Sequence, residues 1–87
     1  MGIYLVLYAS LYRGHGILRV AIEERGSAGP LQVEGDPSRT VKVYGGRVIF
    51  GPNNEVLDDR IFFIDAPDFP ISELVGKRLV PAESPPP

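Results

Sequence analysis

The chain has 87 residues and a formal net charge of −2, from nine basic and eleven acidic side chains. This length suits one domain and is too short for two. Hydrophobic residues make up 44 % of the chain, which is typical of a folded domain rather than a disordered one. Cysteine is absent and His15 is the single histidine, which excludes disulfides, thiolate catalysis and sites that need two imidazoles. The negative net charge argues against a protein whose main function is to bind phosphate groups.

The longest apolar stretch near the start runs from Ile3 to Leu11 and is interrupted by tyrosine and serine. A signal peptide needs a charged start and a cleavage site, and a membrane-spanning helix needs about 20 apolar residues. The stretch meets neither requirement. We therefore expect a cytoplasmic protein without a membrane partner.

The first segment with strand-like composition is Ile3–Tyr12, which is rich in aliphatic and aromatic residues. Its odd-numbered face is the more uniformly apolar and is expected to face the core: Ile3, Leu5, Leu7, Ala9 and Leu11. The segment Arg13–Gly16 is predicted to form a hairpin turn, because its two glycines allow left-handed backbone. The next strand, Ile17–Ile22, is expected to bury Leu18, Val20 and Ile22.

Three further strands are predicted after a loop rich in glycine and proline. Leu31–Val33 is a short strand, and Arg39–Tyr44 alternates with Val41 and Val43 facing inward. Gly45 and Gly46 then permit a bend or bulge before the strand continues over 47–50. The segment Val56–Ile64 ends in a run that is apolar on both sides, as expected for a strand covered on both faces.

The last predicted elements are one helical turn and a closing strand. Asp68 is expected to cap the turn at Ile71–Val75, and Gly76 is expected to end it in the left-handed conformation. Lys77–Val80 would complete the sheet. Six or seven short strands with one helical turn near residues 71–76 predict an all-β fold, a small closed barrel, with a sandwich as the alternative. Residues 1–80 form the expected single domain, and the proline-rich residues 81–87 are expected to be a disordered tail.

Nothing in the sequence predicts an active site, a cofactor or a metal site. The carboxylate pairs Glu23–Glu24 and Asp58–Asp59 could suggest acid–base catalysis, but neighbours on a strand point to opposite faces. Asp65 and Asp68 offer too few ligands for a hard cation. We therefore expect a noncatalytic protein with no small-molecule substrate.

Two binding surfaces remain open. In Ile49–Pro52, an aromatic residue before Gly51 and Pro52 either plugs the core or projects as an interface anchor. The candidate partner-binding residues are Ile49, Phe50, Gly51 and Pro52, with Tyr44 and Arg47 nearby. The alternative is a face that binds single-stranded nucleic acid, because tyrosines with arginines can form a stacking platform. Its candidate residues are Tyr4, Tyr8, Tyr12, Arg13 and Arg19.

The order of segments resembles the Gar-type subunit of H/ACA ribonucleoproteins, the particles that convert uridine to pseudouridine in RNA. The most specific piece is Ile49–Pro52, which stands where the family places phenylalanine-glycine-proline. The other segments similar to family pieces are Leu5–Ser10, Gly14–Gly16, Ile17–Ala21, Pro30–Leu31, Val33–Asp36, Arg39–Tyr44, Ile61–Ile64 and Glu73–Lys77. Together they cover roughly residues 3–80 in the family's order. The stretch Asn53–Arg60 departs from the family, being longer and more polar.

The resemblance implies a six-stranded Greek-key barrel of the elongation-factor and reductase-isomerase type, as in an archaeal-like minimal core without glycine-arginine tails. It implies no catalysis by the chain itself. Members of the family bind the catalytic pseudouridine synthase subunit and assist substrate loading and product release in rRNA pseudouridylation. The synthase is thus the implied partner, and guide RNA would be contacted only indirectly.

Overall fold

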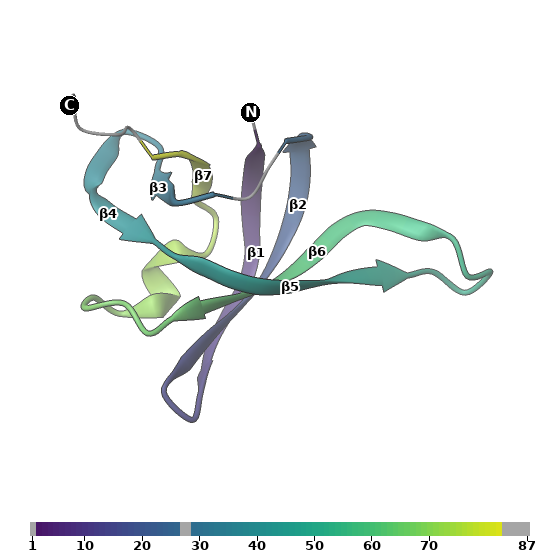
Figure 1. Cartoon of the computed structure of the whole chain (residues 1–87), viewed down its shortest axis with the longest axis horizontal. Helices are drawn as coiled ribbons and strands as arrows, with labels where there is room; N and C mark the ends of the chain where they lie inside the picture. The colour runs from purple at the N-terminus through teal and green to yellow at the C-terminus, as the bar shows by residue number, and fades with distance from the viewer. Residues whose placement is uncertain (1, 27–28, 83–87) are drawn as a thin grey trace.

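The computed structural model describes residues 2–26 and 29–82. Its elements are β1 (Ile3–Tyr12), β2 (His15–Glu24), β3 (Leu31–Val33), β4 (Asp36–Val41), β5 (Val43–Phe50), β6 (Val56–Asp65), the 3₁₀ helix η1 (Ile71–Leu74) and β7 (Arg78–Pro81). The seven strands form one antiparallel sheet in the order β4-β3-β7-β1-β2-β6-β5 (Figure 1). The all-β prediction is confirmed. No helix in the described part of the chain is long and apolar enough to span a membrane.

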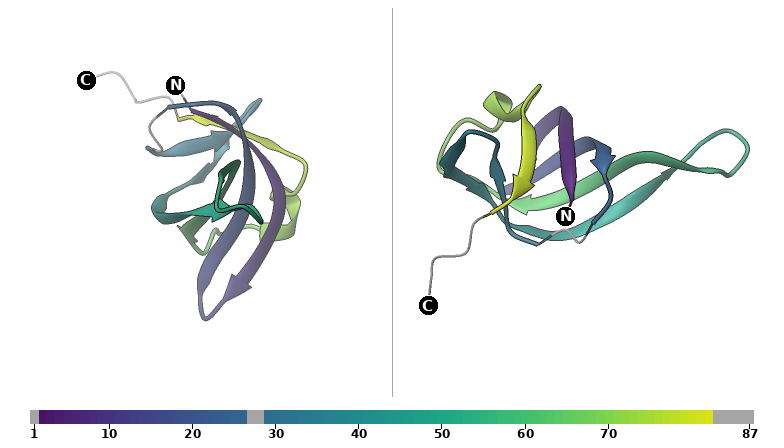
Figure 2. Two further views of the ribbon diagram at one scale, coloured as in Figure 1. Left: turned by 90° about the vertical axis from the view of Figure 1, so that its right-hand side faces the viewer. Right: turned by 90° about the horizontal axis from the view of Figure 1, so that it is seen from above.

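The sheet curls strongly because its two edge strands are consecutive in the sequence. Lys42 alone separates the end of β4 from the start of β5, although the two strands lie at opposite ends of the strand order. Figure 2 shows the short strands β3, β4 and β7 at one end of the molecule, with the β5–β6 hairpin projecting toward the other end. Within residues 2–26 and 29–82, no ladder pairs β4 with β5. The sheet is therefore not closed, and a closed barrel stays a prediction.

The core lies on one face of this sheet. Gly76 and Lys77 continue from η1 and hydrogen-bond to both backbone groups of Val6, at 2.8 and 2.9 Å. This places η1 against β1, where its two apolar side chains close one end of the core. The buried apolar side chains are Tyr4, Val6, Leu18, Val20, Leu31, Val33, Val41, Phe62, Ile64, Ile71, Leu74 and Leu79.

The predicted inward face of the first strand is wrong before the register shift and is confirmed only at Ala9. Tyr4 and Val6 are buried, whereas Leu7 and Leu11 are exposed. A register shift between Val6 and Tyr8 explains the change along the strand, because one extra residue reverses which face the following side chains occupy. After the bulge, Ala9 packs against the core. On β2, by contrast, the predicted inward residues are confirmed: Leu18 and Val20 are buried, and Ile22 packs against the core.

The β1–β2 turn is tighter than the sequence predicts. Only Arg13 and Gly14 form the loop, with φ angles of 52° and 81°, and Tyr12 pairs directly with His15. Gly16 already belongs to β2, where it has a packing role. A Cβ at this position would lie 2.5 Å from Cγ1 of Ile64 and 2.8 Å from Cδ1 of Ile71, so any larger residue would force these two core side chains to shift.

Two predictions near the C-terminus need correction. Asp68 does not cap the helical turn; Pro70 occupies the N-cap position without a side-chain hydrogen bond. Gly76 does follow the turn in the left-handed conformation, with φ of 84°. The sheet also extends beyond residue 80, because Pro81 lies in β7 and the Ala82 N–H donates to the Pro30 carbonyl. The rest of the predicted tail, 83–87, lies outside the described residues.

Two leucine truncations test the direction of the core. Leu18→Ala should lower the free energy of unfolding by about 2–5 kcal/mol, because a fully buried side chain leaves a cavity. Leu11→Ala should change it by less than about 0.5 kcal/mol, because Leu11 is exposed. Urea unfolding of both variants measures the difference. A large loss for Leu11→Ala would contradict the orientation of β1.

Arg78 connects the short strand β7 to its surroundings through two carboxylates. Its guanidinium contacts both carboxylate oxygens of Glu23 on β2, and its Nη1 lies 3.3 Å from Glu34 Oε1 beyond β3. The hydrogen bond from Arg78 lowers the pKa of the Glu23 carboxyl. A carboxyl with a lowered folded-state pKa stabilises the fold above its unfolded pKa and loses that contribution as pH falls through the folded value.

This linkage predicts a small acid sensitivity. The wild-type free energy of unfolding should fall more steeply than that of Glu23→Gln as the pH drops below the usual glutamate pKa of about 4.3. Both residues are solvent-exposed, so the effect should be modest and should shrink in high salt. Denaturant unfolding from pH 7 to 3 provides the comparison. Parallel pH profiles of the two proteins would show that the pair contributes nothing.

Candidate functional site

The β5–β6 hairpin extends beyond the core as an arm, which we define as residues 47–61. The arm points away from the rest of the molecule in Figure 1, and none of the core side chains comes from it. Ladder pairs run from Arg47 with Ile61 out to Phe50 with Val56. At the distal pair both side chains are exposed, Phe50 by 59 % and Val56 by 55 %. The arm therefore carries apolar side chains that the chain itself does not cover.

The tip of the arm is a compact turn. The Gly51 N–H donates to the Glu55 carbonyl at 2.8 Å, and the Asn54 N–H donates to the Gly51 carbonyl at 3.1 Å. Asn54 has a φ of 61°, a left-handed conformation that asparagine tolerates well. A side-chain hydrogen bond from the Asn53 N–H to Glu55 at 2.9 Å adds to this turn. The stretch Asn53–Arg60, which departs from the resembled family, thus begins in this turn and continues into β6.

The candidate partner-binding residues all lie on β5 or in the turn that follows it. Phe50 is exposed and is not a core plug, and Pro52 is exposed beside it. Ile49 is partly buried within the arm. Tyr44 lies at the base of β5, away from the tip. Arg47 is exposed on the proximal half of the arm.

A second surface lies on the outer face of the sheet, opposite the core. The Tyr44 hydroxyl lies 2.9 Å from Nδ1 of His15, and the Tyr44 ring stacks on Phe63 at 6.4 Å between centroids. Tyr12 is the cross-strand partner of His15, which places both on one face. We call Tyr12, His15, Tyr44 and Phe63 the aromatic patch.

The alternative nucleic-acid residues do not all lie together. Tyr8 and Tyr12 are exposed, and the Arg13 guanidinium lies 5.4 Å from the centre of the Tyr12 ring. Tyr4 is 4 % exposed and belongs to the core, which corrects its predicted outward orientation. Arg19 faces outward but pairs with Asp59 at 3.0 Å, so its charge is largely compensated.

A pocket of about 230 Å³ lies at the base of the arm. Its lining residues are Tyr4, Ile22, Arg25, Gly26, Arg60 and Phe62. The Tyr4 and Phe62 rings meet edge to face at 4.9 Å and form the apolar wall. Burial raises the pKa of the Tyr4 hydroxyl, which donates a hydrogen bond to the Gly26 carbonyl at 3.1 Å.

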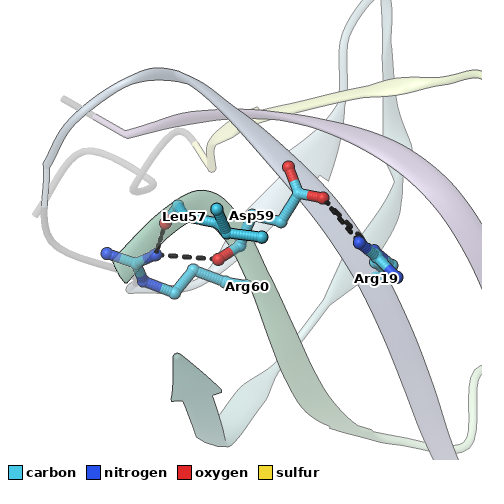
Figure 3. Close-up of polar contacts among 4 residues, drawn as sticks. All are labelled: Arg19, Leu57, Asp59 and Arg60. Carbon is cyan, nitrogen blue, oxygen red and sulfur yellow. Dashed lines mark hydrogen bonds and ion pairs between the residues drawn. The ribbon is translucent and has the colours of Figure 1, made fainter. Parts of the chain in front are cut away.

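Arg60 is held in this pocket by the main chain of its own strand. Its Nη1 donates to the carbonyls of Leu57 and Asp59, both at 2.7 Å (Figure 3). The Asp59 carboxylate is bound by Arg19, so it gives Arg60 no compensating charge. Arg60 is only partly exposed and makes no ion pair within residues 2–26 and 29–82.

No group of three or more histidine or acidic side chains that could hold a metal occurs in the described part of the chain. A second hollow of about 300 Å³ lies beside Tyr44, where Gly45 and Gly46 contribute no side chains.

No protein-family model, curated protein or solved structure matches the chain.

Sequence reasoning did not identify several residues of these surfaces. Val48 and Val56 lie in short segments whose strand pattern gives no indication that they extend past the core. His15 and Phe63 join Tyr44 only through pairing of distant strands. The sequence predicts that the charged residues Asp58, Asp59 and Arg60 are solvent-exposed. Only the fold shows that both carboxylates form ion pairs with other arginines.

Proposed function

We propose that this chain is a noncatalytic subunit that docks a larger protein through its arm. The observation that carries the proposal is the exposed apolar pair of Phe50 and Val56 on a projecting, hydrogen-bonded hairpin. Exposed aromatic side chains on a rigid support are typical anchors of protein interfaces. Val48 on the same strand is also exposed and widens the apolar surface.

The partner we propose is the catalytic pseudouridine synthase of an H/ACA ribonucleoprotein. This choice rests on the resemblance of segments across roughly residues 3–80, including Ile49–Pro52, which lies at the distal end of the arm. In this role the chain would assist substrate loading and product release in rRNA pseudouridylation without contacting guide RNA directly. The closed barrel of that family would require β4 and β5, already joined through Lys42, to pair along their edges.

Truncation of the anchor tests the docking. Phe50→Ala should weaken binding to a pseudouridine synthase from the same source by about 2–4 kcal/mol, which is roughly 30- to 700-fold in Kd. Isothermal titration calorimetry with the purified synthase measures this change. The free energy of unfolding should change by less than about 0.5 kcal/mol, because Phe50 is exposed.

Tyr12→Ala provides the matched control, because it removes an equally exposed aromatic ring from the β1–β2 hairpin. Synthase binding of this variant should equal that of the wild type. A Phe50→Ala variant that unfolds would place the residue in the core and contradict the site. A synthase that does not form a stoichiometric complex with the wild-type chain would contradict the proposed partner.

The second candidate function is binding of single-stranded nucleic acid. The observation that favours it is the aromatic patch, in which Tyr12 carries the Arg13 guanidinium over its ring. Successive bases can stack on such rings, and arginine adds cation–π attraction. The net charge of −2 and the paired Arg19 speak against it.

An oligonucleotide titration separates the two candidates. Nucleic-acid binding predicts a micromolar or tighter Kd for single-stranded RNA at low salt, and steep weakening as salt rises. Tyr12→Ala should then cost about 1–3 kcal/mol, while Phe50→Ala should have no effect. Fluorescence anisotropy measures both. No detectable binding at low salt would eliminate this candidate.

A further inference from the structure

The pocket at the base of the arm contains a positive charge, Arg60, that has no counterion among residues 2–26 and 29–82. The two acidic residues that precede Arg60 are both taken by other arginines: Asp58 by Arg25 at 2.7 Å, and Asp59 by Arg19 at 3.0 Å. Strand alternation separates Asp59 and Arg60 on opposite faces of β6, as Figure 3 shows. A partly buried cation without a paired anion is costly, so the site favours any anion that can reach it.

The free donors of Arg60 have a defined geometry. A guanidinium carries five N–H donors, and two lie on Nη1. Nη1 is bound to the Leu57 and Asp59 carbonyls, which fixes the group. The remaining edge, formed by Nε and Nη2, is the fork that binds a carboxylate through two parallel hydrogen bonds.

The surroundings select the class of anion. The Tyr4 and Phe62 rings and Ile22 line the pocket. Such apolar walls lower the local polarity and strengthen a hydrogen-bonded ion pair between Arg60 and one anion. Arg25 is the other cation in the lining, but it is already bound to Asp58 at the exposed rim. Among the described lining residues, Arg60 is the only cation without an ion pair, so its single charge matches one carboxylate better than a doubly charged phosphate.

The position of the pocket indicates what carries that carboxylate. Val48 is the ladder partner of Arg60, so the exposed apolar surface of the arm begins directly beside the pocket. From these contacts we infer that the pocket binds an acidic side chain, aspartate or glutamate, from the partner segment whose apolar residues cover the arm. The inference rests on the proposed docking function and adds a charged anchor to its apolar one.

A titration without the synthase tests the pocket itself. The probes are the peptide acetyl-Val-Leu-Glu-Leu-Val-amide, its glutamine counterpart and inorganic phosphate, each added to the full-length labelled chain at matched ionic strength. The glutamate peptide should shift the Arg60 Nε–H resonance in NMR spectra, with at least about 10-fold higher affinity than the glutamine peptide. Equal binding of the two peptides, tighter binding of phosphate, or no shift with any probe would overturn the inference.

Variants assign the effect to one arginine. Arg60→Met keeps an apolar stem without the charge and should abolish the preference for glutamate over glutamine. Lys77→Met is the matched control, because it removes an exposed positive charge that lies outside the pocket lining and leaves the Arg25–Asp58 pair intact, and it should keep the preference. If Arg60→Met does not fold, Arg60→Lys keeps a charge without the fork and should retain only part of the wild-type preference.

The synthase titration then separates this inference from the proposed function. Arg60→Met should weaken synthase binding about 30-fold, alongside the loss expected for Phe50→Ala. Wild-type affinity in Arg60→Met together with weak binding in Phe50→Ala would overturn the acidic anchor and leave the docking function intact. If the synthase does not bind the wild-type chain, the docking function is contradicted. The peptide titration would still decide which ligand the pocket binds.

Discussion

Burial on one face only is the constraint from which both candidate surfaces follow. Seven strands form a single sheet, and its buried side chains lie on the face that the curl and η1 enclose. A four-residue 3₁₀ helix is too short to cover a second face. The outer face of β1, β2, β5 and β6 therefore keeps its aromatic side chains in contact with solvent. Likewise, β5 and β6 continue past the enclosed volume, and among the described residues β6 pairs with β2 only as far as Asp59, so the distal part of the arm has no third strand beside it.

Curling this sheet requires local breaks in strand pairing, and those breaks decide where side chains point. Register shifts occur in β1 between Val6 and Tyr8, and in β5 between Val43 and Gly45. A bulge bends a strand and reverses the face of the residues that follow it. The bend in β5 places Tyr44 over Phe63 on the outer face, where it also reaches His15. The aromatic patch is thus a consequence of the curl rather than of strand composition.

The sequence predicts the strands well wherever polar and apolar residues alternate, as in Ile17–Ile22, and Gly45–Gly46 marks its bulge. It does not predict the face of β1, because both faces of Ile3–Tyr12 are apolar and the bulge at Leu7 has no glycine to signal it. The sequence cannot distinguish a Phe50 side chain that fills the core from one that projects as an interface anchor, because its exposure depends on where the core ends. The Arg60 pocket is invisible in sequence, because it depends on pairing between strands far apart in the chain.

The ion pairs of Asp58 and Asp59 on β6 contribute little to stability, but they affect the charge of the neighbouring Arg60. Exposed pairs such as Arg25–Asp58 contribute about 0–1 kcal/mol to stability. They nevertheless occupy both carboxylates that precede Arg60, so the one partly buried cation of the strand keeps its charge. Nucleic acid binding draws on many cations spread along a surface, because each phosphate contact releases a counterion. A chain of net charge −2 that concentrates one oriented guanidinium beside exposed valine and phenylalanine side chains is better suited to a protein segment with a single acidic residue.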